Sequence, residues 1–184
     1  MTSKALFLDR DGIINVDHGY VHKIEDFDFT DGIFDVCRHA LELGYLIIVI
    51  TNQGGIARGY YSIKQFERLT SWMKEQFKAQ GIKITDVYFC PHHPKHGVNN
   101  YVQTCHCRKP DPGMILTAQA KYQISLKDSI LIGDRYSDIQ AAESAGIKTK
   151  ILLNSPFVNE ASENLPTTFA HKISRITGAI EYIN

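Results

Sequence analysis

Length and composition already limit what this chain can be. Its 184 residues suffice for one domain with its own apolar core, so we expect a single domain over 1–184. Lys plus Arg and Asp plus Glu number 20 each, so no excess charge indicates a nucleic-acid or membrane partner. The longest apolar run, 45–50, is far too short to span a bilayer. Four cysteines and an N-terminus without a signal-peptide pattern predict a cytoplasmic protein in a reducing compartment.

Short apolar runs along the chain predict buried β-strands. They do not alternate in polarity, which is typical of strands that crossover helices cover on both faces. In chain order the predicted strands are Ala5–Leu8, Leu46–Ile50, Asp86–Cys90, Ser129–Ile132 and Lys148–Leu153.

Helical patterns separate these strands. The predicted helices are Gly32–Leu43, Ser62–Ala79, Gly113–Tyr122 and Tyr136–Ala145. Ser62 is the predicted N-cap of the second helix, and Gly44, Gly81 and Gly146 follow helices as C-terminal stop signals do. Strands alternating with helices predict an α/β fold, a three-layer sandwich with a central parallel sheet.

Two segments break this alternation. The stretch Pro91–Pro112 has neither a helical nor a strand pattern, and loops of this length are usually functional or held by something other than a core. Near the C-terminus, the region around Ile173–Ile183 predicts a closing helix preceded by a short strand.

Polar residues follow the first predicted strand, at the edge where a parallel sheet binds ligands. Asp9 and Asp11 come directly after the strand, and Gly12 follows them. Two carboxylates one residue apart repel each other unless a cation or a proton lies between them. The arrangement suits a divalent metal ion, a carboxylate nucleophile and an acid/base partner, so it points to phosphoryl chemistry.

Three later segments add groups to the same edge. Thr51–Gly55 follows the second strand and offers a hydroxyl and backbone N–H groups that can cradle phosphate oxygens. Arg108 and Lys109 precede a predicted helix and can offset charge on a transferring phosphoryl group. Asp134 ends the fourth strand and would complete an oxygen-rich Mg²⁺ site. Each signal alone is commonly a solvated turn or surface pair, and it is their order along the chain that strengthens them.

A cysteine–histidine cluster lies in the irregular stretch. It comprises Cys90, His92, Cys105 and Cys107. Three thiols and one imidazole are a donor set preferred by structural Zn²⁺, which would fix a zinc-held loop over about residues 90–107 and hold Arg108 beside it. The one-residue gaps are tighter than usual, so reduced, unliganded cysteines stay an alternative. We expect the neighbouring His93, His96 and His106 to be solvated.

Four motifs stand in a fixed order along the chain. They are Asp9-x-Asp11-Gly12, Thr51-Asn52, Lys109 and Gly133-Asp134-x-x-x-Asp138. In this order they resemble the haloacid dehalogenase (HAD) superfamily of phosphatases, with its Rossmann-like fold. Longer blocks resemble the D-glycero-D-manno-heptose-1,7-bisphosphate 7-phosphatase family over nearly the whole chain: Asp17–His22, Thr51–Gly59, Cys90–Pro94 and Cys105–Pro110. Gly54 departs from the serine expected in close relatives, but its backbone N–H remains, so we expect a small effect on phosphate binding.

The resemblance implies the chemistry of the aspartates. Asp9 would be the nucleophile that forms an aspartyl-phosphate, and Asp11 would protonate the leaving alkoxide and then activate water. The Asp9 carboxylate, the Asp11 backbone carbonyl and Asp134 would hold a catalytic Mg²⁺.

Thr51 and Lys109 would complete the catalytic set by steadying the phosphoryl oxygens, and Asp138 would orient Lys109 or a metal-bound water. Too few residues separate Gly12 from Thr51 for a large cap domain, so neighbouring residues would recognise the substrate. The implied substrate contacts are Asp17, His18, Gly19, Tyr20, Asn52, Gln53, Gly54, Arg108 and Arg135.

The implied function is Mg²⁺-dependent removal of the C7 phosphate of a heptose 1,7-bisphosphate, in the nucleotide-activated heptose route of lipopolysaccharide biosynthesis. We expect a monomer. One alternative is a histidinol-phosphate phosphatase, which shares fold, motifs and zinc loop, although the block His18–Val21 favours the heptose substrate. A non-catalytic, zinc-stabilised binding module is the alternative of another class, and the intact Asp9, Asp11 and Lys109 argue against it. Neutral net charge counts against a nucleic-acid substrate.

Overall fold

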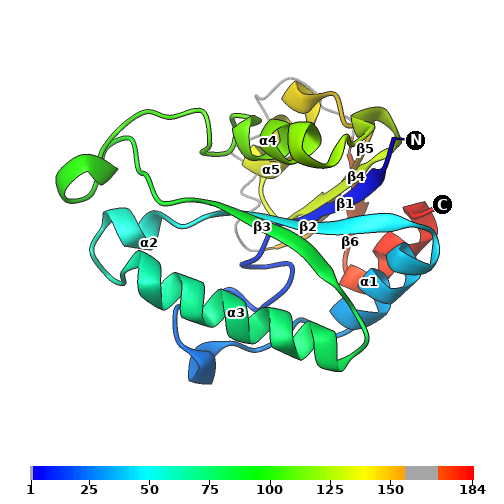
Figure 1. Cartoon of the computed structure of the whole chain (residues 1–184), viewed down its shortest axis with the longest axis horizontal. Coiled ribbons are helices and arrows are strands. Elements are labelled where there is room, and N and C mark those ends of the chain that lie inside the picture. The colour runs from blue at the N-terminus through cyan, green and yellow to red at the C-terminus, as the bar shows by residue number, and fades with distance from the viewer. Residues whose placement is uncertain (1, 156–169) are drawn as a thin grey trace.

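Six parallel strands form an open sheet in the computed structural model, which describes residues 2–155 and 170–184 (Figure 1). The strands are β1 (Lys4–Leu8), β2 (Tyr45–Asn52), β3 (Ile84–Cys90), β4 (Ile130–Gly133), β5 (Thr149–Leu153) and β6 (His171–Ile173). Their order in the sheet is β3-β2-β1-β4-β5-β6. The chain builds outward from β1 to β3 and then returns to the other side of β1. The strand order therefore reverses between β1 and β4, where such sheets bind ligands.

Both faces of the sheet are buried because its strands are apolar on both sides. Along β1, Leu6 and Leu8 belong to one core cluster, whereas Ala5 and Phe7 belong to the other. All four side chains are fully buried. Successive side chains of a strand point to opposite faces, so an uninterrupted apolar run is what a strand between two layers requires. The prediction of strands buried on both faces is confirmed.

Helices cover the two faces (Figure 1). One face carries α1 (Ile33–Glu42), α3 (Ile63–Ala79) and the 3₁₀ helix η5 (Ile176–Tyr182), and the other carries α4 (Gly113–Tyr122) and α5 (Tyr136–Ala145). The stripe Leu69, Met73 and Phe77 of α3 packs into the first core. Ser62 caps α3 in a capping box with Gln65, as predicted. The predicted three-layer α/β sandwich is confirmed.

Two details differ from the prediction. β2 continues beyond Ile50 because its ladder with β3 extends to the pair Asn52 and Cys90, so Thr51 and Asn52 are strand residues. The closing helix is a 3₁₀ helix over Ile176–Tyr182, and the short strand before it, β6, pairs with β5 at the edge of the sheet.

At the carboxyl end of the sheet, the connections after β2 and β4 are short, whereas those after β1 and β3 are long. Between β1 and α1 the described structure has only the 3₁₀ turn Ile24–Asp26, so the absence of a large cap is confirmed. The short helix α2 (Gly54–Ala57) follows β2. After β3, the predicted irregular stretch Pro91–Pro112 projects from the sheet with one 3₁₀ turn, Asn99–Tyr101 (Figure 1).

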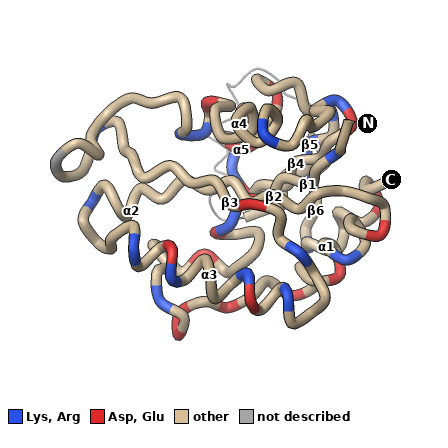
Figure 2. Tube along the Cα trace, viewed as in Figure 1, with Lys and Arg blue, Asp and Glu red and all other residues tan. Residues whose placement is uncertain are grey.

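Charged residues of both signs are interspersed, in keeping with their equal numbers. Along α3, basic and acidic residues follow one another within a few positions (Figure 2). Within residues 2–155 and 170–184, no helix combines the length and the apolar character needed to cross a bilayer.

Candidate active site

A cavity of about 570 Å³ lies at the carboxyl end of the sheet, where the strand order reverses. It is reached by residues that follow β1, end β2 and begin α5, because parallel strands deliver their loops to one edge. Most of the predicted catalytic and substrate residues line it: Asp9, Asp11, Asp17, Gly19, Tyr20, Asn52, Gly54, Arg108, Lys109 and Arg135.

Asp9 and Lys109 form a buried ion pair in this cavity. Lys109 Nζ lies 3.0 Å from Asp9 Oδ1 and 2.7 Å from Asp138 Oδ1, and it donates to the carbonyl oxygen of Ile50 at 2.9 Å. Burial raises the pKa of Asp9 to about 8, with the Lys109 cation opposing it. Burial lowers the pKa of Lys109, but the carboxylates of Asp138 and Asp9 outweigh that effect and raise it. Lys109 therefore stays a cation beside the reacting carboxylate.

Asp134 is fully buried, and neither carboxylate oxygen has a hydrogen-bond partner among the described residues. Asp9, Asp134 and Asp138 can each place one oxygen within 4.8 Å of the others. Burial raises the pKa of Asp134 to about 7, and Asp138 adds to this effect. Buried polar groups without partners call for a missing ligand, and oxygen donors of this kind fit a hard divalent cation.

Gly12 makes room for Asp134. Its φ is +89°, in the left-handed region, and a Cβ at this position would overlap the Asp134 carboxylate. Only glycine meets both requirements without strain. The glycine directly after Asp11 therefore allows the candidate cation ligands from β1 and β4 to approach each other.

Asp11 is held on both carboxylate oxygens. Arg10 donates to Oδ1 from Nε (3.1 Å) and Nη2 (2.6 Å), and to Oδ2 from Nη2 (2.8 Å). Asn15 Nδ2 also donates to Oδ1 at 3.1 Å, and Gln53 Nε2 donates to Oδ2 at 3.0 Å. Arg10, Asn15 and Gln53 are almost completely buried, whereas 19 % of the Asp11 side chain is exposed. The carboxylate thus faces the cavity while buried donors hold it from the interior.

Three of the predicted catalytic and substrate residues, and also the predicted Mg²⁺ ligand Asp134, lie outside the cavity lining. Thr51 and Gln53 are both 1 % exposed, and Gln53 Nε2 donates to Thr51 Oγ1 at 2.8 Å. The sequence suggested that Gln53 and His18 contact substrate. Instead, Gln53 packs against Asp11 inside the protein, and His18 pairs with Asp28 at 2.8 Å in a separate outer groove. A polar residue in a loop sequence does not reveal which way it points.

The loop Asp17–Tyr20 reaches the cavity from the connection after β1. Asp17 Oδ2 accepts a hydrogen bond from Arg135 Nη2 at 3.0 Å, which ties the loop to the start of α5. Asp17 Oδ1 accepts from the Gly19 N–H at 2.9 Å. The Tyr20 ring contacts the Tyr60 ring edge-on, with 4.8 Å between centroids. The loop therefore carries a carboxylate and an aromatic ring to the cavity wall.

Arg108 reaches the cavity from the loop after β3. Its Nη1 donates to the carbonyl oxygen of His92 at 2.9 Å. A Cβ at Gly54 would lie 3.7 Å from Arg108 Nη1 and from the ring of His93, so a Cβ makes only ordinary contacts at this position. The guanidinium faces the same cavity as Asp9 and can bind a second anionic group there.

Four cavity residues were missed by the sequence reasoning: Arg58, Tyr61, His93 and Ser137. Contrary to expectation, His93 lines the cavity, and partial burial followed by the nearby Arg108 and Arg58 cations lowers its pKa. Arg58 and His93 stand inside the sequence blocks that carry the resemblance, which is the signal that could have found them. Tyr61 and Ser137 carry no comparable signal.

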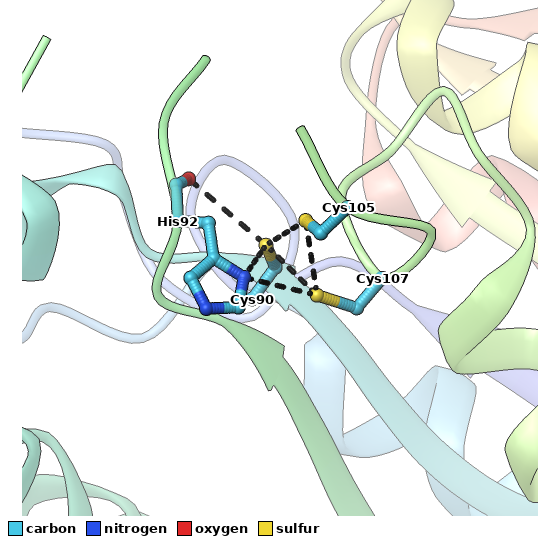
Figure 3. Close-up of side chains that lie close together, drawn as sticks. All are labelled: Cys90, His92, Cys105 and Cys107. Carbon is cyan, nitrogen blue, oxygen red and sulfur yellow. Dashed lines mark hydrogen bonds between the residues drawn. The ribbon is translucent and has the colours of Figure 1, made fainter. Parts of the chain in front are cut away.

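A candidate metal centre lies at the base of the projecting loop (Figure 3). It unites Cys90, His92, Cys105 and Cys107. The three Sγ atoms are 3.2–3.5 Å apart, and His92 Nδ1 lies 3.5 Å from Cys107 Sγ and 3.8 Å from Cys90 Sγ. Tetrahedral Zn²⁺ with bonds of about 2.3 Å places its sulfur ligands about 3.8 Å apart. These donors could therefore hold a metal ion after a small outward movement.

The fold and the cavity together define a HAD-like hydrolase. A family profile described as HAD-hydrolase-like matches residues 106–173. A crystal structure of D,D-heptose 1,7-bisphosphate phosphatase from B. bronchiseptica, complexed with magnesium and phosphate, is similar to the chain with a TM-score of 0.83 and 26% identity, covering 98% of this chain and 97% of that one. A putative HAD-like phosphatase from Mesorhizobium loti has a TM-score of 0.85 at 28% identity, covering 99% and 86%.

Sequence relatives narrow the class. D-glycero-beta-D-manno-heptose-1,7-bisphosphate 7-phosphatase of Vibrio cholerae is 45% identical over 94% of both chains. D-glycero-alpha-D-manno-heptose-1,7-bisphosphate 7-phosphatase of Burkholderia mallei is 54% identical over 83% of this chain and 81% of that one. The chain therefore belongs to the D-glycero-D-manno-heptose-1,7-bisphosphate 7-phosphatase family, and it is a phosphoric monoester hydrolase.

Proposed function

We propose that this phosphatase removes the C7 phosphate of D-glycero-D-manno-heptose 1,7-bisphosphate through an aspartyl-phosphate. One observation carries the mechanism: the buried Asp9 carboxylate lies 3.0 Å from Lys109 Nζ, next to the unpartnered oxygens of Asp134. This arrangement combines a nucleophile, a fixed cation and a place for a divalent ion in one cavity. The substrate is supported by the names of relatives that match nearly the whole chain.

The reaction has two steps. An Asp9 oxygen bonds to phosphorus while the bond from phosphorus to the sugar oxygen breaks, and Asp11 gives its proton to that oxygen. Water then attacks phosphorus, Asp11 takes the water proton, and the bond to Asp9 breaks to release inorganic phosphate. Lys109 stabilises the charge on the phosphoryl oxygens in both steps.

Two metal ions belong to this proposal. The Asp9 carboxylate, the Asp11 backbone carbonyl and Asp134 would hold Mg²⁺, which supplies the positive charge that lets an anionic nucleophile approach an anionic phosphate. Asp138 holds Lys109 in place. The cysteine–histidine cluster would hold a structural Zn²⁺, because four protein donors leave no open coordination position.

The distal phosphate would bind at the arginine side of the cavity. Arg108 offers a planar guanidinium that matches phosphate oxygens, and Arg58 and His93 line the same region. The sugar would lie between this group and the loop Asp17–Tyr20, with Asn52, Gly54 and Arg135 completing the wall. The residues that react and those that select the substrate thus share elements: Asp11 and the loop Asp17–Tyr20 both follow β1, and Arg108 directly precedes Lys109.

The proposed setting is the cytoplasm, where a monomer would serve the heptose route of lipopolysaccharide biosynthesis. Support for a reducing compartment comes from the four cysteines, all of which are free thiols, with three of them in the candidate metal centre. The relatives are named for both anomers, so the anomer is decided by experiment.

The test is phosphate release by the purified protein with Mg²⁺. Both anomers of heptose 1,7-bisphosphate and histidinol phosphate are compared, with Asp9→Asn as the blank. We expect rapid release from one bisphosphate anomer and none in the variant. Preference for histidinol phosphate would overturn the substrate but keep the mechanism. Release from no substrate above the blank would overturn the catalytic proposal and favour a zinc-stabilised binding module.

A further inference from the structure

A chain of buried hydrogen bonds runs from Tyr61 to Asp11. The Tyr61 hydroxyl group donates to Gln53 Oε1 at 2.5 Å. Gln53 Nε2 then donates both to Asp11 Oδ2 at 3.0 Å and to Thr51 Oγ1 at 2.8 Å. Gln53 is 1 % exposed and Tyr61 is 5 % exposed, so bulk water cannot replace these bonds without opening the structure.

The donor and acceptor at each step of this hydrogen-bond chain follow from its two end residues. Asp11 Oδ2 already accepts a hydrogen bond from Arg10 Nη2, so it is an acceptor and the NH₂ group of Gln53 must face it. Its Oε1 then faces Tyr61, whose hydroxyl group must donate. Burial raises the pKa of Tyr61, which keeps the hydroxyl group protonated. The Tyr61 proton therefore fixes which side of the Gln53 amide meets Asp11.

The surrounding packing locks Tyr61 in this position. The His22 ring stacks on the Tyr61 ring with 4.9 Å between centroids and an interplanar angle of 6°. A Cβ at Gly55 would overlap the Tyr61 ring, so the first turn of α2 leaves room for this ring only because it contains glycine. Tyr61 itself lies in the segment between α2 and α3. Its ring is therefore held by two other parts of the fold: the connection after β1, through His22, and α2, at Gly55.

Gln53 provides a second hydrogen-bond donor, besides Arg10, to Asp11 Oδ2. Arg10 binds both oxygens of Asp11 and also donates from Nη2 to the carbonyl oxygen of Val21 at 2.7 Å. Without Gln53, Arg10 would be the only donor to Oδ2, because Asn15 donates to the other oxygen. Gln53 donates to that oxygen from a separate element, the start of α2 after β2. Two donors from separate elements fix a planar group more tightly than one.

We propose that Tyr61 and Gln53 are positioning residues that aim the Asp11 carboxyl group at the leaving oxygen of the substrate. The proposal rests on the acid/base role of Asp11 proposed above. Tyr61 acts through Gln53 and has no part in the bond-making steps. Its contribution is to the geometry of one proton transfer, and such transfers are sensitive to displacements well below 1 Å.

The leaving group separates this role from a merely structural one. A sugar alkoxide leaves poorly and needs the proton of Asp11, whereas 4-nitrophenolate leaves readily without it. The ratio kcat/KM reports the steps up to release of the alcohol, so it excludes the later attack by water. A misaimed Asp11 should therefore lower kcat/KM for a sugar phosphate much more than for 4-nitrophenyl phosphate.

The experiment compares Tyr61→Phe with the wild type on heptose 1,7-bisphosphate and on 4-nitrophenyl phosphate. We expect kcat/KM to fall by about tenfold or more for the sugar and by less than about threefold for the aryl ester. Tyr60→Phe is the matched control, because the neighbouring Tyr60 is 55 % exposed and keeps its ring contact with Tyr20. An equal fall for both substrates, or no fall for either, would overturn the proposal.

A second measurement does not depend on the substrate. Hydrogen exchange of the Gln53 side-chain NH₂ group, followed by NMR well below the unfolding temperature of both proteins, should be slow in the wild type and much faster in Tyr61→Phe. Fast exchange in the wild type would overturn the proposed chain of hydrogen bonds. If the protein ignores heptose bisphosphate but cleaves another sugar phosphate, only the proposed substrate fails, and the leaving-group comparison is made with that ester. If Asp9→Asn stays active, the proposed mechanism fails and the positioning role falls with it.

Discussion

The side chain of Asn52 is bonded to the backbone of Lys109 on both sides. Asn52 Nδ2 donates to the Lys109 carbonyl oxygen at 3.0 Å, and the Lys109 N–H donates to Asn52 Oδ1 at 3.1 Å. The end of β2 thereby fixes a loop residue that lies 57 positions later in the chain. This pairing places the Lys109 ammonium group within reach of Asp9 and Asp138.

Asn52→Ala should therefore impair catalysis through Lys109. Loss of two partly buried hydrogen bonds should lower the free energy of unfolding by about 1–3 kcal/mol. A displaced Lys109 should lower kcat by about 10- to 100-fold. Kinetics and denaturant unfolding test this, with the exposed Asn100→Ala as control. A variant with normal kcat would show that Lys109 does not need this support.

Gly12→Ala should disrupt the candidate cation site. The added methyl group would overlap the Asp134 carboxylate, and φ of +89° is strained for alanine. We expect at least about a 100-fold loss of activity and much weaker Mg²⁺ binding, measured by calorimetry. Gly44→Ala is a matched control, because Gly44 has φ of +81° but nothing within 4 Å of its Cβ position. If both variants lose activity equally, overlap with Asp134 is not the cause.

Loss of the metal centre should affect substrate binding more than chemistry. Cys105→Ser removes one donor of the cluster. Arg108 directly follows the cluster's last member, Cys107, and its guanidinium contacts another member, His92. We expect loss of bound zinc by elemental analysis and a roughly tenfold higher KM for a bisphosphate. KM for 4-nitrophenyl phosphate, which has no second phosphate, should change less. The Cys37→Ala variant, changed at a buried position of α1, should keep its zinc. Normal KM without zinc would separate the centre from Arg108.

Stability should depend on pH in a way that Mg²⁺ reverses. The pKa values of Asp9 and Asp134 are raised from 3.8 to about 8 and about 7, in each case chiefly by burial. Between the unfolded pKa of 3.8 and these raised values, the folded protein therefore binds more protons than the unfolded chain. The stability of the metal-free protein should then fall as pH rises from about 4 to 8. Bound Mg²⁺ favours the ionised forms, so its stabilising effect should grow over the same range.

Thermal unfolding with EDTA or Mg²⁺ at several pH values checks this dependence. Asp134→Asn should flatten it, because the asparagine does not titrate. An equal effect of Mg²⁺ at pH 5 and pH 8 would contradict the expectation.

The sequence predicted the fold well because the strands of this sheet are buried on both faces. Uninterrupted short apolar runs such as Leu46–Ile50 are typical of strands that helices cover on both faces. It also predicted that Asp9, Lys109 and Asp134 converge, because the carboxyl ends of parallel strands meet at one edge. The pattern could not show whether the segment Ile176–Tyr182 is an α- or a 3₁₀ helix, since both place similar residues on one face.

The orientation of individual polar side chains was beyond the sequence. Gln53 follows a strand end and reads as a cavity residue, but its amide is enclosed by Asp11, Thr51 and Tyr61. That enclosure depends on the approach of Tyr61 past Gly55, which is a tertiary contact. His18 shows the converse, because its ring turns to Asp28 rather than to the cavity.

β1 packs against both cores, and it also carries the reacting group at its end. Asp9 is therefore anchored in the part of the molecule that opens last when the fold fluctuates. Apart from Asp11 and Lys109, the loops that face the substrate, after β1 and β3, are outside the sheet and can change sequence at little cost to the fold. Natural variation can thus alter which phosphate ester is accepted, and even which anomer, while the bond-breaking apparatus is inherited intact.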